Sequence, residues 1–156
     1  VRKYWQLTAF DRDALAWACK LHEIGLCISH SHHHHHGYYL IEHSDIAGFS
    51  KTEQSFIAIL IRNQRRSINF KSLMTLPEMR AVSALRCAFL LRLAVLFYRS
   101  HTAGKIPKLK ITVEKAKLNL IFSKKWLAKH PLTKSDLESE RGYLKTASID
   151  LAIIEK

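Results

Sequence analysis

Histidines are concentrated in one stretch of this chain, residues 21–49, which has the sequence LHEIGLCISHSHHHHHGYYLIEHSDIAGF. A His-Glu pair, His22 and Glu23, is followed by His30 and then by the run His32–His36. Imidazoles titrate near neutral pH, bind metal ions and contact phosphate oxygens, so a dense group of them is a candidate functional site. Hydrophobic sequence flanks the run on both sides, which argues against a purification tag.

Basic side chains supply a second set of groups suited to anions. Those whose chemistry fits phosphate oxygens are Arg62, Arg65, Arg66, Arg92, Arg99 and His101. Each has a structural alternative. Arg92 lies in an apolar segment and could instead pair with a buried carboxylate or carbonyl group, and Arg65 and Arg66 could form only a solvated helix end. The histidines could likewise serve packing alone.

A strong positive charge limits the partners of this chain. Lys and Arg total 25 against 13 acidic residues, which gives the 156-residue chain a formal net charge of +12. That imbalance predicts a polyanionic partner: polyphosphate, nucleotides, nucleic acid or an acidic protein surface. A chain of this length suffices for one domain, or for one domain and a small appendage.

Cysteine usage and hydropathy indicate a cytoplasmic location. Cys19, Cys27 and Cys87 lie in apolar helical contexts without Cys-x-x-Cys spacing, a pattern typical of buried thiols in a reducing compartment. The longest apolar run, residues 87–98, is interrupted by Arg92 and is too short to span a bilayer. We therefore expect no membrane association.

The histidine-rich stretch is flanked by two predicted helices. Apolar periodicity predicts a buried helix from Asp11 to Ile24, capped by Asp11 or Asp13 and closed by Gly25 at the C′ position. A second helix is predicted over residues 36–43. This arrangement places the His-Glu pair on the last turn of the first helix, facing whatever the histidine run encloses.

Two further helices follow the histidine-rich stretch. Ser50 and Glu53 match a capping box, which predicts a helix with its basic end at residues 62–66. Pro77 at a first helical position predicts the start of the longest helix, which ends near Ser100. The first hundred residues are therefore predicted to be all-helical.

Beyond residue 104 the pattern changes to the alternation typical of half-buried strands. Apolar and polar residues alternate over 109–113 and 118–122, which predicts a hairpin, and again over 149–153. Between them, a capping box at Ser135-Asp-Leu-Glu138 predicts a helix that ends near Ala147. The expected fold is mostly α, an all-helical domain over residues 1–103 followed by a small α+β (β-β-α-β) subdomain over residues 104–156.

Four segments around the histidines form a combined pattern: Leu21–Gly25, Ile28–His36, Tyr39–Ile41 and Ser44–Ser50. Together they resemble the C-terminal part of the exopolyphosphatase/guanosine pentaphosphate phosphohydrolase family. That family typically has an LHD-or-LHE-x-G pair, an H-S-x-x-H-x-H-S group, a Tyr-Leu-Ile helix and a Ser-Asp-x-x-Gly-Phe turn. The resemblance extends over nearly the whole chain and implies that its helical domain is HD-like.

The resemblance also implies that this chain is the non-catalytic C-terminal module of a phosphoanhydride hydrolase. The family's catalytic site and its Mg²⁺ belong to an N-terminal pair of actin-like domains, and no glycine-rich phosphate loop occurs in this sequence. We therefore expect a fragment without a cofactor of its own. It would bind polyphosphate or guanosine pentaphosphate, contact the actin-like domains and support a homodimer. His30, His34 and His36 fall on the family's three recurring histidine positions.

Three departures from the related metal-dependent pattern argue against a metal centre. His22 and Glu23 form a degenerate HD-type pair, in which glutamate extends the carboxylate by one methylene group. Val95 and Tyr98 stand where relatives often carry acids, and Gln64 replaces a histidine. We therefore expect neither a bound metal nor catalytic residues. Two alternatives stay open: a metal-dependent HD-type phosphohydrolase in its own right, and a basic nucleic-acid-binding module.

Overall fold

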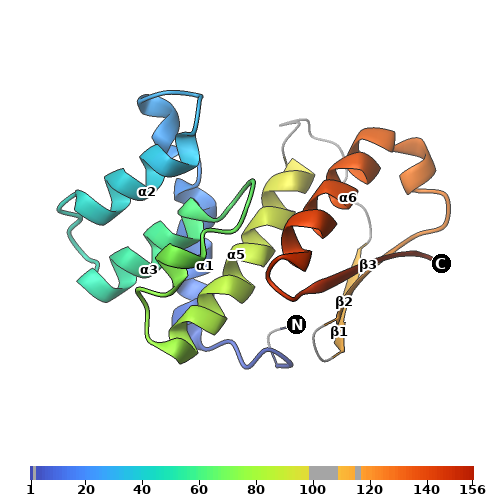
Figure 1. Ribbon diagram of the computed structural model, residues 1–156, viewed down its shortest axis with the longest axis horizontal. Coiled ribbons are helices and arrows are strands. Elements are labelled where there is room, and N and C mark those ends of the chain that lie inside the picture. The colour runs from blue at the N-terminus through green and yellow to red at the C-terminus, as the bar shows by residue number, and fades with distance from the viewer. Residues whose placement is uncertain (2, 99–108, 115–116) are drawn as a thin grey trace. The chain divides into compact units, whose positions relative to one another are not determined.

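The computed structural model describes residues 1, 3–98, 109–114 and 117–156 (Figure 1). Within these residues the chain is mostly helical with a small three-stranded sheet, as the sequence predicts. It divides into two compact units, Arg2–Val95 and Leu96–Lys156. The predicted domain boundary at residues 103–104 lies outside the described residues, as do Arg99 and His101.

The first unit contains the predicted helices and two short ones that the sequence did not indicate. Its elements are α1 (Ala9–Leu21), the 3₁₀-helix η1 (Ile24–Cys27), α2 (His33–His43), α3 (Lys51–Arg62), α4 (Phe70–Leu73) and α5 (Glu78–Tyr98), whose last three residues belong to the second unit. α3 packs against both α1 and α2, and α2 also packs against η1 (Figure 1). The central position of α3 explains why its residues 56–61 are all buried.

Side-chain caps begin α1 and α3. Ser50 and Glu53 form the predicted capping box, in which the Ser50 N–H donates to the Glu53 carboxylate at 2.8 Å. The first helix begins earlier than predicted, because its N-cap is Thr8 and not Asp11 or Asp13. Asp11 is instead the third helical residue of a second capping box, and its carboxylate accepts a hydrogen bond from the Thr8 N–H at 2.7 Å.

Gly25 allows close packing. It does not adopt the left-handed conformation that was predicted for it at the end of the first helix. Among the described glycines, only Gly48 has a positive φ. A Cβ atom on Gly25 would lie 1.9 Å from the carbonyl oxygen of His33 and 2.5 Å from the backbone nitrogen of Gly37. Gly37 in turn leaves room for Ile61 of α3, whose Cγ2 would be 2.9 Å from an added Cβ. The two glycines therefore let η1, α2 and α3 approach one another closely.

The core of the first unit comes largely from α3 and α5. The buried apolar residues of α5 are Ala84, Cys87, Ala88, Phe89, Leu91 and Leu93. Cys87 is thus buried as predicted, and burial together with the nearby Asp11 carboxylate raises the pKa of its thiol to about 12. The prediction of buried thiols is wrong for Cys19 and Cys27, which are exposed. α1 buries the face that carries Ala14 and Ala18, so Cys19 points outward.

Within the described part of the chain, one helix has the length and apolar composition to cross a membrane. It is α5, with 21 residues. The buried core helix of a soluble protein meets the same criterion. The side chain of Arg92, in the C-terminal half of α5, is only 1% exposed and donates to backbone carbonyl groups of the same unit. These contacts are those of a core helix.

The second unit has the predicted β-β-α-β order. Its elements are β1 (Lys110–Glu114), β2 (Lys117–Phe122), the 3₁₀-helix η2 (Leu127–Lys129), α6 (Pro131–Lys145) and β3 (Asp150–Glu155). β1 pairs with β2 antiparallel, which confirms the hairpin, and β3 pairs with the other edge of β2 in parallel. α6 packs against β3 (Figure 1). The core of this unit contains Leu118, Leu120, Phe122, Leu137, Leu144 and Leu151.

The start of α6 differs from its prediction. The helix begins at Pro131, four residues before the predicted capping box at Ser135. Proline at the first helical position has its φ already set for a helix and lacks the N–H that would go unbonded there. The proline is therefore the effective start signal, and Ser135 lies inside the helix, where its backbone carbonyl accepts a hydrogen bond from the Ser139 hydroxyl at 3.1 Å.

The close approach at Gly25 predicts a strong effect of a single methyl group. Gly25→Ala should lower the free energy of unfolding by about 3 kcal/mol, because the added Cβ meets backbone atoms that cannot move away cheaply. Thermal and urea denaturation followed by circular dichroism would measure the change. Gly142→Ala is the matched control: it lies inside α6 with nothing within 4 Å of an added Cβ. It should stabilise by about 0.5–1 kcal/mol, and equal effects in both variants would contradict the packing role of Gly25.

Candidate polyanion-binding site

The histidine run forms the N-terminal end of α2. The helix begins at His33, three residues before the predicted start near His36, so most of the run lies in its first turn. His32 is the N-cap in a left-handed conformation (φ 55°), and no side chain caps the helix. The first N–H groups of a helix have no acceptor within it and favour a negative charge nearby. The start of α2 therefore combines backbone donors with imidazoles.

His33 and His34 are the buried members of the run. His33 is 9% exposed and His34 is 2% exposed. Nη1 of Arg65 lies 3.3 Å from Nδ1 of His33, and since a guanidinium group can only donate, the imidazole nitrogen is the acceptor in this hydrogen bond. This contact joins the start of α2 to the turn after α3.

The turn after α3 is held by the buried guanidinium of Arg92. Its Nη1 donates to the carbonyl oxygen of Asn63 at 2.8 Å, and its Nη2 donates to that of Arg66 at 2.7 Å. Arg66 itself is exposed and has a left-handed backbone (φ 59°). Of the two roles that the sequence left open for Arg92, pairing with carbonyl groups is the one observed. Arg92 thus fixes the backbone that carries Arg65 and Arg66.

Burial and positive charge lower the pKa of three imidazoles in the run. Burial, followed by the charges of His35, Arg62 and Arg65, lowers the pKa of His34 from 6.5 to about 3. The pKa of His33 is also lowered, first by burial and then by Arg65. Burial and Arg62 lower that of His35. Arg62 is itself half-buried, and its own pKa is lowered by burial. Arg62 and Arg65 therefore bring positive charge to the start of α2.

Two buried polar atoms at this site have no hydrogen-bond partner among the described residues. They are Nδ1 of His34 and Oε1 of Gln64, whose side chains are each 2% exposed. The amide nitrogen of Gln64 donates to the carbonyl oxygen of His22 at 2.5 Å. An unpaired buried polar group costs about 1–3 kcal/mol, and such groups in a native fold call for an explanation such as a binding role.

The structure brings together some of the predicted site residues. Arg62 and Arg65 both act on His34 and are thus its electrostatic neighbours. His30 is exposed, with its ring centroid 6.1 Å from that of His33. His33 and His35 were not selected from the sequence, because the family pattern marks other histidines and the predicted start of α2 falls after both residues. An earlier helix start would have placed both of them in the first turn.

The His-Glu pair, His22 and Glu23, lies beside this site. Nε2 of His22 is 4.0 Å from the Glu23 carboxylate, and Nδ1 of His22 is bonded to the Cys19 carbonyl at 2.8 Å. Nowhere in the described part of the chain do three His, Cys, Asp or Glu side chains converge in a way that could hold a metal ion.

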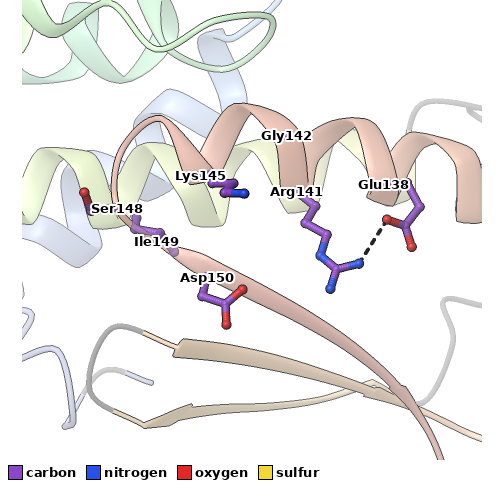
Figure 2. A pocket seen from close by; sticks show the side chains of 7 residues that line it. All are labelled: Glu138, Arg141, Gly142, Lys145, Ser148, Ile149 and Asp150. Atoms are coloured by element: carbon purple, nitrogen blue, oxygen red, sulfur yellow. Dashed lines mark hydrogen bonds and ion pairs between the residues drawn. The ribbon is translucent and has the colours of Figure 1, made fainter.

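A separate surface pocket lies in the second unit, between the C-terminal half of α6 and the start of β3 (Figure 2). It is lined by Glu138, Arg141, Gly142, Lys145, Ser148, Ile149 and Asp150. Arg141 and Glu138 are bonded to each other at 3.3 Å. Since none of the predicted site residues lines it, this pocket does not belong to the histidine-rich site.

The lowered pKa of His34 predicts a loss of stability in acid. With a folded pKa near 3 and an unfolded pKa near 6.5, the neutral form stabilises the fold fully above pH 6.5. As the pH falls below that value, the unfolded chain binds a proton that the folded chain does not, which costs up to about 1.4 kcal/mol per pH unit. His34→Asn should therefore flatten the dependence of the unfolding free energy on pH between 7 and 5, measured by urea denaturation.

The control for this measurement is His43→Asn, which removes an exposed histidine at the opposite end of α2. If the two variants flatten the pH dependence equally, or His34→Asn leaves it unchanged, the buried imidazole is not its source.

A comparison with protein families agrees with the motifs around the histidines. A family model described as Ppx/GppA phosphatase, domain III, matches residues 2–141 of the 156-residue chain. The matched region contains all the helices of the first unit, the β1–β2 hairpin and most of α6. Since this match covers most of the sequence, the chain belongs to the Ppx/GppA phosphatase family and contains its domain III.

Proposed function

We propose that this chain binds the phosphate chain of a polyanionic substrate through a His-Arg cluster, consisting of His33, His34, Arg62 and Arg65. The observation that carries the proposal is the approach of two guanidinium groups to buried histidines: Arg65 lies 3.3 Å from His33, and Arg62 and Arg65 both lower the pKa of His34. The substrate is polyphosphate or guanosine pentaphosphate. Both substrates present rows of anionic oxygens, to which guanidinium groups donate strong hydrogen bonds.

Burial increases the effect of these charges on a phosphate group. Electrostatic interactions strengthen as the surroundings exclude water, and Arg62 and Arg65 are both half-buried. A phosphate oxygen placed near His34 would also favour the protonated imidazole. Binding would then be coupled to proton uptake, and the unpaired Nδ1 of His34 would gain an acceptor.

Hydrolysis itself is assigned to other domains of the parent protein. In the proposed arrangement, N-terminal actin-like domains hold Mg²⁺ and cleave the terminal phosphoanhydride bond, and water supplies the oxygen of the released orthophosphate. Domain III would hold the remaining chain of the substrate, so its role is positioning and retention. The exposed Arg66 next to the cluster would extend the contact along the phosphate chain.

Binding of long-chain polyphosphate should be strongly salt-dependent and sensitive to the arginines of this turn. Arg65→Gln together with Arg66→Gln should weaken binding, because two cationic contacts are lost. By analogy with nucleic acids, the slope of log affinity against log salt concentration should fall by about one for each contact removed. Isothermal titration calorimetry at several salt concentrations would measure both quantities.

The matched control removes the same charge elsewhere. Lys110→Gln with Lys117→Gln neutralises two exposed lysines on the sheet of the second unit. It should reduce affinity less than the arginine pair does. An equal loss in both double variants would show that the attraction is diffuse, and the assignment to the His-Arg cluster would fail.

We further propose that the chain forms a homodimer through exposed apolar residues where α4 leads into α5. Met74 is 82% exposed and Met79 is 87% exposed, and Phe70 and Val82 are each 43% exposed. Clustered apolar side chains at a surface are typical of interaction sites. The family resemblance supports a second copy of the chain as the partner.

Met74→Lys with Met79→Lys should convert the dimer to a monomer, because two charges would have to be buried in the contact. Sedimentation equilibrium would show the change in mass. Leu132→Lys, which alters a residue 81% exposed on α6, is the control and should leave the dimer intact. A wild-type chain that stays monomeric at high concentration would refute the proposal.

A further inference from the structure

Three rings form a continuous stack in the second unit, where β2 leads into α6. Phe122, Trp126 and His130 follow one another at intervals of four residues. The ring centroids of Phe122 and Trp126 are 5.5 Å apart with an angle of 11° between the planes. Those of Trp126 and His130 are 3.9 Å apart at 13°. All three rings are therefore nearly parallel.

The stack runs from the core to the surface. Phe122 is 1% exposed, Trp126 is half-buried and His130 is exposed. Nδ1 of His130 donates to the carbonyl oxygen of Trp126 at 2.8 Å, which fixes the plane of the imidazole ring. Within the part of the chain that the structure describes, no other ring stacks on His130. The outermost ring thus presents a flat face beyond the stack.

Four lysines lie close to His130 in the sequence. Residues 123–134 contain Lys124, Lys125, Lys129 and Lys134 and no acidic residue, and all four lysines are exposed. The nearby Glu155 carboxylate accepts a hydrogen bond from the Leu127 N–H at 3.1 Å. The segment that carries Trp126 and His130 is therefore rich in exposed lysines.

Packing alone explains only the inner part of the stack. Phe122 and Trp126 cover the core at the end of β2, and this packing does not require a third ring. His130 adds little buried area, since it is exposed. Aromatic pairs often meet edge to face, as Trp5 and Phe89 do here at 80°. The parallel arrangement instead leaves the face of His130 available to another flat ring.

We propose that the Phe122–Trp126–His130 stack is a platform for the base of a nucleotide, whose phosphates are held by the lysines of the same segment. Flat aromatic faces flanked by basic side chains bind bases by stacking and the backbone by charge, without a need for base-specific hydrogen bonds. The ligand is a phosphorylated nucleoside, either free as a nucleotide or within single-stranded RNA. Inorganic polyphosphate has no ring and cannot use the platform.

This site is independent of the His-Arg cluster. The stack lies entirely within Leu96–Lys156, and the cluster lies entirely within Arg2–Val95. The two proposals also differ in ligand chemistry, since one requires a phosphate chain and the other a base. Either can therefore fail without the other.

The test compares a short labelled single-stranded RNA with an abasic strand of equal length, by fluorescence anisotropy with the whole 156-residue chain. The wild-type chain should bind the RNA more tightly than the abasic strand. His130→Ala should weaken RNA binding by about 5- to 100-fold, the usual effect of removing one stacking ring. His130→Phe should keep most of the affinity, because it restores a flat ring without the imidazole nitrogens. Neither variant should change binding of the abasic strand or of polyphosphate.

A competition with GTP distinguishes the two sources of the base. Displacement of the RNA by GTP, with the same sensitivity to His130→Ala, identifies a nucleotide site; no displacement identifies a strand site. Equal wild-type affinity for the RNA and the abasic strand would overturn the proposal. So would equal losses in His130→Ala and His130→Phe, or no loss in His130→Ala. Circular dichroism melting of each variant checks that the fold is kept.

Discussion

The buried guanidinium of Arg92 is the contact on which the histidine-rich site depends. It reaches from α5 to the two carbonyl groups that define the turn after α3. That turn carries Gln64, which is bonded to the end of α1 at His22, and Arg65, which is bonded to the start of α2 at His33. Through this turn, the buried guanidinium of Arg92 links α5 to the end of α1 and the start of α2, which are far apart in sequence.

A buried charge is costly unless hydrogen bonds compensate it, and carbonyl groups do so here. The helix that carries Arg92 is otherwise apolar enough to resemble a membrane-spanning segment. Of the three arginines in this helix, only Arg92 is buried, and it gives the core a polar anchor. Packing of apolar side chains alone would set the distance between α3 and α5, whereas two directed hydrogen bonds also set the path of the turn.

The sequence predicted the elements that have strong local signals. The Ser50 capping box, the proline before α5 and the alternation in the β1–β2 hairpin all gave correct elements. It failed where two local signals competed, as in α6, where Pro131 and not the box at Ser135 begins the helix. It also placed the start of α2 too late, since histidine has no strong helix preference.

The candidate site was less predictable than the fold, because its geometry depends on contacts between distant residues. The choice of His34, Arg62 and Arg65 came from motif and charge, and the structure makes these residues electrostatic neighbours. The bond between Arg65 and His33 joins residues 32 positions apart and has no local signature. The role of Gly25 is similar, since only the structure shows that α2 approaches it so closely.

The mixed sheet of the second unit has a consequence for the order of folding. β1 and β2 pair as a local antiparallel hairpin, which can form within microseconds. β3 pairs with β2 in parallel, and Lys117 pairs with Asp150 across the whole crossover that contains η2 and α6. This pairing therefore forms after the hairpin. Closing such a long loop is slow. In the interval, the backbone edge of β2 that later pairs with β3 is open, and such an edge favours aggregation.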